Sequence, residues 1–457
     1  MKKFISLFML TTIILSGCGV VDSVEIISDG NFASEISTTT TSDSANDDDI
    51  QQTESATSYS TTTTSSHTEQ TTEKSIFVVT AETSTKTQAV YTIPPIETAI
   101  QTTTAPVAVQ MSSKVQNHLA EMSLHEKICQ MFIVIPEAVS GYDVFTYVDC
   151  NFHKGYSDYP VGGFIFFAKN IISSEQTAIM ITDMQNDALY MGTGAFMAVD
   201  EEGGTVTRVQ SQLGEQAVYD MNYYGGLNDW NTAYSVGEII GSYLSGYGFN
   251  LDFAPVADVN ISPYNELGSR IFSTDPQIVA DMSGAVVDGL QSQGICSTLK
   301  HFPGLGAGNS NTHYNSVWID RTHEQLQQTE FPAFKGGIDA GSDFVMVGHQ
   351  ITSASGDNLP GNLSKVVVTD WLKNELGFKG LVVTDSHSMG AITNVYTSGE
   401  ASVLAIEAGV DMVLMPSSLA DAVAGVEQAV QSGRISEERI NESVVKILSK
   451  KNELGLI

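Results

Sequence analysis

The sequence predicts an α/β fold: a single (β/α)8 TIM barrel preceded by a disordered Ser/Thr-rich stalk. Eight short segments rich in Val, Ile, Leu, Phe and Met recur in residues 111–457, and amphipathic helical segments lie between them. Near-continuous apolar strands are typical of parallel sheets buried on both faces, and eight strand–helix units make a barrel. The Ser- and Thr-rich composition of residues 19–110 predicts the stalk.

Eight strands are expected at the apolar segments, which are residues 130–135, 163–167, 195–199, 249–254, 295–299, 344–347, 381–384 and 412–415. The clearest amphipathic helices are residues 173–190, 232–246, 277–293, 322–340 and 436–455. A doubly wound open sheet is the competing fold. No glycine-rich phosphate-binding turn follows the first strand, which favours the barrel.

Residues 1–18 are expected to be a lipoprotein signal peptide. Two lysines precede residues 4–15, an apolar run too short to span a bilayer as a mature helix. The segment Leu15-Ser16-Gly17-Cys18 resembles a bacterial lipobox, in which Cys18 is lipidated and becomes the first mature residue. We therefore expect a membrane anchor through Cys18 and a location on the extracellular face of the cell membrane. The alternative is a plain signal peptide followed by a chance cysteine.

Residues 19–110 have too little clustered apolar surface to offset the entropy of an ordered chain. They contain threonine runs at residues 38–41 and 61–64 and three consecutive acids at 47–49. We expect a disordered linker between the membrane and the predicted barrel at residues 111–457, with serines and threonines suited to O-glycosylation.

The net charge of −32 disfavours nucleic acid and anionic lipid headgroups as partners. A neutral or cationic substrate is the more natural ligand, although such a charge also serves simple solubility. No CxxC or histidine-rich spacing suggests a metal, and no cofactor is expected. We expect the chain to act as a monomer.

Polar side chains follow five of the predicted strands, at the barrel end where active sites lie. They occur at residues 200–204, 255–258 with Arg270, 300–304 with His313, His349, and 385–388. One such residue alone would equally suit a helix cap or a loop contact. The complete set indicates a shared site on one rim.

The motifs at these strand ends resemble those of glycoside hydrolase family 3, in its bacterial β-N-acetylhexosaminidase branch. The matching segments occur in the order typical of the family, across residues 112–457. They are Asp200-Glu201-Glu202-Gly203-Gly204 with Arg208, residues 250–259, residues 269–276 with Arg270, Lys300-His301-Phe302-Pro303-Gly304, and residues 383–389 with Asp385.

The resemblance implies a role for each residue. Asp385 would be the nucleophile that forms a covalent glycosyl-enzyme, and His313 would be the general acid/base. An imidazole can give and take a proton near neutral pH, which suits both halves of a double displacement. The side chains implied to bind hydroxyls of the non-reducing-end sugar are Asp200, Arg270, Lys300 and His301. Neighbouring Lys and Arg would also lower the pKa of Asp385.

The sequence departs from the family pattern at position 311. The branch has an Asp two residues before the catalytic histidine, where it orients the imidazole, and this chain has Asn311. An amide oxygen can still accept the imidazole N–H, but it cannot stabilise an imidazolium with a full charge. We expect Asn311 to orient His313 in a slower or narrower enzyme.

The resemblance implies a retaining exo-β-N-acetylhexosaminidase that acts on peptidoglycan fragments or chitin oligosaccharides. Relatives with glucosidase activity usually take their acid/base from a second domain, whereas here a His-bearing loop is present. Three alternatives stay open: a phosphorylase, a β-glucosidase-type hydrolase, and a non-catalytic sugar-binding lipoprotein. Asp258, His349 and His387 are expected to have structural roles, and Tyr223-Tyr224 could stack on a sugar.

Overall fold

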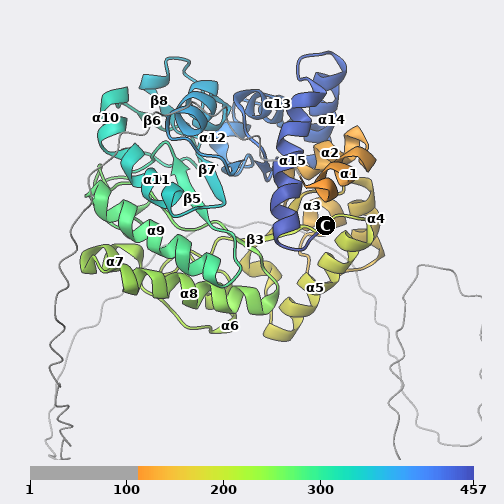
Figure 1. Ribbon diagram of the computed structural model, residues 1–457, viewed down its shortest axis with the longest axis horizontal. Coiled ribbons are helices and arrows are strands. Elements are labelled where there is room, and N and C mark those ends of the chain that lie inside the picture. Colours follow the sequence, from red (N-terminus) through yellow and green to blue (C-terminus); the bar gives the residue numbers. More distant parts are fainter. Residues whose placement is uncertain (1–111) are drawn as a thin grey trace, which may run out of the picture. The chain divides into compact units, whose positions relative to one another are not determined.

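The computed structural model describes residues 112–457 (Figure 1). The signal peptide at 1–18, its lipidated Cys18 and the linker at 19–110 lie outside the described residues. In the described part, no helix combines the length and apolar character needed to cross a bilayer.

All eight predicted strands are present and run parallel to their neighbours. They are β1 (Phe132–Val134), β2 (Gly163–Phe166), β3 (Phe196–Val199), β4 (Leu251–Asp252), β5 (Thr298–Phe302), β7 (Phe344–Val347), β9 (Leu381–Thr384) and β10 (Val413–Leu414). Every one of these residues is buried, as expected for strands covered on both faces.

The strands form two parallel sheets. One has the order β10-β1-β2-β3-β4 and the other the order β5-β7-β9. Isolated parallel bridges connect them, at Leu251 with Cys296 and Val256 with Lys300 on one side and at Val383 with Met412 on the other. The α/β class with parallel sheets is therefore confirmed. The expected barrel is present in part, because continuous pairing stops at the two junctions.

Fifteen α-helices lie in residues 112–457. They are α1 (Ser113–Glu121), α2 (Leu124–Gln130), α3 (Glu137–Ser140), α4 (Cys150–Asp158), α5 (Ser174–Tyr190), α6 (Val209–Leu213), α7 (Met221–Leu227), α8 (Trp230–Tyr247), α9 (Pro276–Ser292), α10 (His323–Gln328), α11 (Glu330–Asp339), α12 (Gly390–Thr393), α13 (Ser398–Ala408), α14 (Leu419–Gln431) and α15 (Glu437–Glu453). The short turns are η1 (Ala168–Asn170), η2 (Gly268–Arg270), η3 (Ser353–Ser355) and η4 (Gly361–Leu363), and η5 (Val366–Glu375) is a π-helix.

Two segments differ from the sequence prediction. The helix expected at 322–340 is interrupted between α10 and α11. Pro332 explains this break, because its ring clashes with the carbonyl of Gln328, the last residue of α10. A further parallel pair, β6 (Trp318–Ile319) with β8 (Ile351–Thr352), was not predicted. Two-residue strands carry no alternation that a sequence pattern can detect.

Helices α8, α9 and α11 pack side by side around the sheets (Figure 1). Glycines allow the close approach of α8 and α9. A Cβ at Gly237 would lie 2.5 Å from the carbonyl oxygen of Val286, and one at Gly289 would lie 2.2 Å from that of Tyr234. Any larger side chain would separate the two helices, and with them the strands that carry the polar rim.

Candidate active site

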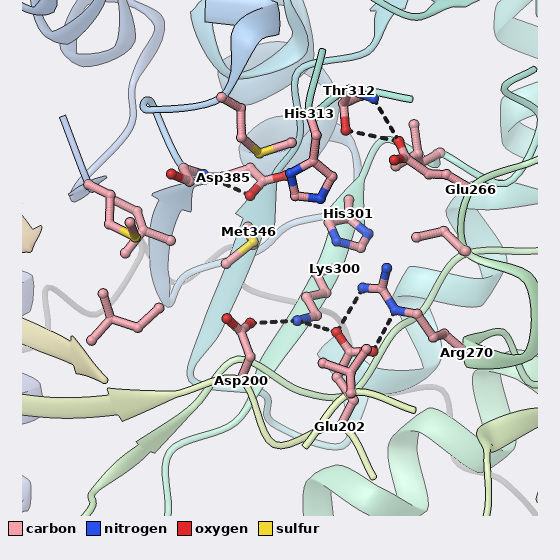
Figure 2. A pocket seen from close by; sticks show the side chains of 18 of the residues that line it. Asp200, Glu202, Glu266, Arg270, Lys300, His301, Thr312, His313, Met346 and Asp385 are labelled. Carbon is pink, nitrogen blue, oxygen red and sulfur yellow. Dashed lines mark hydrogen bonds and ion pairs between the residues drawn. The ribbon is translucent and has the colours of Figure 1, made fainter. Parts of the chain in front are cut away.

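A cavity of about 370 Å³ opens where the strands end (Figure 2). Six of the seven predicted catalytic and sugar-binding residues line it: Asp200, Arg270, Lys300, His301, His313 and Asp385. Asn311 is not among the lining residues. Segments up to 185 positions apart in the sequence thus meet at one site, which supports the expectation of a shared rim.

Lys300 is at the centre of a buried ion-pair cluster (Figure 2). Its Nζ lies 2.9 Å from Asp200 Oδ1 and 2.5 Å from Glu202 Oε1. Glu202 also accepts two parallel hydrogen bonds from Arg270, each 2.7 Å long. This fork geometry fixes the guanidinium plane, so the two cations reach the cavity in defined positions.

Charge neutralisation explains why these groups are ionised although buried. Burial alone would raise the pKa of the Glu202 carboxyl, but Lys300 and Arg270 outweigh it and lower that pKa from its ordinary 4.5 to about 2. Burial likewise opposes the charge of Lys300, and Asp200 and Glu202 reverse the effect and raise the pKa of its ammonium. The cluster therefore keeps its charges at neutral pH.

Asp385 directly follows β9, and one of its oxygens accepts the backbone N–H of Ser386 at 2.7 Å. Burial raises the pKa of this carboxyl, but His349, His301 and the Ser386 N–H together hold it below its usual range. Lys300 contributes less than these groups. The carboxylate form, which nucleophilic attack requires, is thus favoured, although mainly by imidazoles rather than by the Lys and Arg that the sequence suggested.

Asp258 fixes the position of His301 from below the cavity. One carboxylate oxygen accepts both the backbone N–H and the Nδ1–H of His301 at 2.9 Å, and the other accepts the backbone N–H of Leu305. With Nδ1 engaged in this way, Nε2 is the ring nitrogen available to a ligand. This matches the structural role expected for Asp258.

His313 lies on the loop between β5 and β6, and its side chain reaches the cavity (Figure 2). Asn311 contacts it differently from the expectation. The Asn311 side-chain oxygen accepts the backbone N–H of His313 at 2.8 Å, and the imidazole makes no hydrogen bond within residues 112–457. A short side chain two residues before its target naturally caps the backbone in this way, as in an Asx turn. The orientation of the ring by Asn311 stays a prediction.

Three charged residues that line the cavity had no role assigned from the sequence: Glu202, Arg208 and Glu266. Buried Glu201 accepts the backbone N–H groups of Arg208, Val209 and Gln210, which fixes the segment carrying Arg208. The guanidinium of Arg208 forms no ion pair in the described part of the chain. The run of three acids at 200–202 was the available signal, but the pattern does not tell which of them faces the cavity.

The glycines after these acids are required by the turn. Gly203 and Gly204 have φ values of 86° and 57°, a conformation that other residues adopt at a cost. A Cβ at Gly204 would lie 2.0 Å from a carboxylate oxygen of Asp220. The chain can therefore turn sharply after β3, which brings Glu202 under Arg270.

His349 and His387 form a buried network near Asp385. The amide nitrogen of Asn362 contacts a ring nitrogen of each histidine at 3.0 Å, and His349 Nε2 donates to the carbonyl of Ser386. Burial lowers the pKa of His387 to about 3, so its ring is neutral. Both histidines pack as expected. Tyr223 and Tyr224 are not among the residues that line the cavity.

The described residues contain no group of three or more His, Cys, Asp or Glu side chains arranged to hold a metal ion. Four polar side chains of the cavity, Asp200, Glu202, Arg270 and Lys300, are instead paired with one another. Neutral ligands rich in hydroxyl groups suit such a surface, because each hydroxyl can both donate to a carboxylate and accept from a cation.

Comparisons with known proteins agree with these motifs. A model of the glycosyl hydrolase family 3 N-terminal domain matches residues 123–450. Beta-hexosaminidase A of Pseudoalteromonas piscicida is 27% identical over 324 residues, which cover 65% of this chain and 54% of that protein. The beta-hexosaminidase of Nitrosomonas eutropha is 30% identical over 296 residues, which cover 62% of this chain and 83% of that protein.

A solved structure has the same fold. The glycoside hydrolase family 3 beta-N-acetylglucosaminidase from Paenibacillus sp. str. FPU-7 matches with a TM-score of 0.69 and 33% identity, over 73% of this chain and 63% of that chain. The alignments span about half of the Pseudoalteromonas protein and less than two thirds of the Paenibacillus chain. Because the family model covers most of the described residues, this chain belongs to glycosyl hydrolase family 3.

Proposed function

We propose that the protein is a retaining exo-β-N-acetylhexosaminidase, with Asp385 as nucleophile and His313 as general acid/base. The observation that carries the proposal is that Asp385 and His313, from separate segments, line the same cavity as the Lys300–Glu202–Arg270 cluster. The names of the relatives support the substrate class.

In the first step, a carboxylate oxygen of Asp385 attacks the anomeric carbon while His313 protonates the leaving glycosidic oxygen. The bond to the leaving group breaks and a glycosyl ester on Asp385 forms. In the second step, His313 takes a proton from water, and the resulting hydroxide equivalent displaces Asp385. Two inversions give net retention of the β configuration.

Asp200, Arg270, Lys300 and His301 would bind the hydroxyl groups of the terminal sugar. A charged donor or acceptor forms stronger hydrogen bonds than a neutral one, and a fixed ion-pair cluster loses little entropy on binding. These contacts would place the anomeric carbon next to Asp385, which is the condition for a fast displacement.

A panel of 4-nitrophenyl β-glycosides tests the proposal. We expect N-acetylglucosaminide turnover to exceed that of the glucoside, with N-acetylglucosamine as the product. Preference for the glucoside would indicate the β-glucosidase-type alternative. A sugar phosphate formed in phosphate buffer would indicate a phosphorylase. Absence of turnover, combined with sugar binding, would indicate a non-catalytic lectin-like lipoprotein.

We further propose that the two sheets together act as one (β/α)8 barrel, which the isolated bridges at both junctions support.

The natural substrates would be peptidoglycan fragments or chitin oligosaccharides, reached by a monomer anchored outside the membrane through Cys18. Replacing Cys18→Ala and following release of the protein from membranes tests the anchor. Continued membrane attachment of the variant would contradict it.

A further inference from the structure

The loop that carries His313 is fastened to a neighbouring loop by a carboxylate that the proposed chemistry does not use. Glu266 lies between β4 and α9, and one of its oxygens accepts two hydrogen bonds from Thr312 (Figure 2). The backbone N–H of Thr312 is 3.0 Å away and its hydroxyl is 2.9 Å away. Thr312 is buried and directly precedes His313, and Glu266 lines the cavity.

On its opposite side, the same loop is hydrogen-bonded to the segment that follows Asp385. The backbone N–H of Gly390 donates to the carbonyl of His313 at 3.0 Å, and that of Ala391 donates to the carbonyl of Thr312 at 3.3 Å. Both donors belong to the first turn of α12, which begins five residues after Asp385. These bonds set the separation between the acid/base loop and the nucleophile.

Close contact on this side depends on a residue without a side chain. A Cβ at Gly390 would lie 2.5 Å from the carbonyl oxygen of Tyr314 and 3.0 Å from that of His313. Backbone cannot yield as a flexible side chain can, so any substitution would push the loop away from α12.

The position of the His313 imidazole depends on the backbone of this loop. The His313 side chain is exposed, and its ring makes no hydrogen bond within residues 112–457. The side-chain oxygen of Asn311 instead accepts the backbone N–H of His313. We propose that Glu266 is a positioning residue for the acid/base. Through Thr312, Glu266 fixes the backbone from which the imidazole projects. A carboxylate at position 311 would instead position the imidazole by contact with the ring itself. The inference rests on the proposed function.

The leaving group distinguishes positioning of the acid from general damage. A 2,4-dinitrophenolate leaves without protonation, whereas the sugar leaving group of N,N′-diacetylchitobiose requires it. General acid catalysis contributes about 10²–10⁴-fold, so we expect Glu266→Ala to lower kcat/KM for the disaccharide at least about tenfold. For the dinitrophenyl glycoside we expect a loss below about threefold. Glu266→Gln keeps the accepting oxygen and should restore most of the activity.

Two further variants test the contacts that hold the His313 loop. Gly390→Ala should show the same selective loss on the disaccharide. Thr312→Val removes one of the two hydrogen bonds to Glu266 and should show a smaller selective loss on the disaccharide. This variant also tests the inference if Glu266→Ala does not fold. Asp320→Ala is the matched control, because this acid follows β6, accepts a hydrogen bond from Ser353 and does not line the cavity. Gly246→Ala controls for the glycine, since a Cβ there meets nothing within 4 Å.

Equal losses on both substrates in Glu266→Ala and Thr312→Val, or no loss on the disaccharide, would overturn the inference. Failure of the proposed function looks different, because the unaltered protein would then turn over neither substrate, and the inference would fall with it. Turnover by the unaltered protein with a loss confined to the disaccharide supports both.

Discussion

Glu202→Gln should destabilise the protein by about 3 kcal/mol at neutral pH, because it removes the charge that buried Lys300 and partly exposed Arg270 share. Glu202 is 4% exposed and contacts Lys300 at 2.5 Å and Arg270 at 2.7 Å. These contacts lower its pKa from 4.5 to about 2. Each unit of such a shift corresponds to about 1.4 kcal/mol, which gives roughly 3 kcal/mol. Breaking a buried ion pair by removing one partner costs about 3–5 kcal/mol in other proteins.

The pH dependence gives this prediction a signature. A carboxyl whose pKa is depressed by folding contributes its full stabilisation above about pH 4.5, and loses it as pH falls toward about 2. The difference in unfolding free energy between the parent protein and Glu202→Gln should therefore shrink as pH falls through this range. Glu202→Gln should also lower activity at neutral pH, because Lys300 and Arg270 lose the carboxylate that fixes their positions.

Urea unfolding followed by tryptophan fluorescence measures the difference in free energy at several pH values. Glu442→Gln is the matched control, because this glutamate is exposed and forms no ion pair in residues 112–457. A change below about 1 kcal/mol at neutral pH, the value usual for a surface pair, would refute the reasoning. So would a difference that stays constant down to pH 2.

Three further predictions concern Asn311, His387 and Gly204. Asn311→Asp should raise kcat for N,N′-diacetylchitobiose in steady-state kinetics, because a carboxylate can stabilise an imidazolium with a full charge and an amide cannot; no gain would contradict this. His387→Gln should make the free energy of unfolding fall less between about pH 6.5 and 3. Burial lowers the pKa of His387 to about 3, so this histidine opposes folding progressively as pH falls through that range. An equal fall in unfolding free energy in the variant and the parent protein would contradict this. Gly204→Ala should lower stability by about 1 kcal/mol or more, measured by urea unfolding, because φ is 57° and Asp220 occupies the space.

Apolar content was sufficient to predict where the chain enters the sheets. Each of the eight apolar segments contains or overlaps a strand, because a strand covered on both faces must be apolar throughout. The boundaries were less predictable. The fifth strand was expected to end at Leu299 but continues through Lys300 and His301 to Phe302, and these polar residues are buried there because Glu202 and Asp258 neutralise or bond them.

The candidate site was predictable where its residues follow strand ends. Asp200 and Asp385 are of this kind, and parallel strands bring their ends together. Lys300 follows the predicted end of the fifth strand but lies inside β5. Glu266 was not predictable, because it meets Thr312 across 46 positions and from a loop without regular structure. The contact of Asn311 with the backbone of His313 was not predicted either, since a sequence motif does not separate a bond to the ring from a bond to the backbone.

Covalent trapping tests the central claim most directly. The protein is incubated with an activated 2-deoxy-2-fluoro glycoside, whose fluorine slows hydrolysis of the ester, and the adduct is located by peptide mass spectrometry. We expect one glycosyl group on the peptide that contains Asp385, and none in Asp385→Asn. A label on another carboxylate, or turnover of the aryl glycoside by Asp385→Asn at the parent rate, would contradict it.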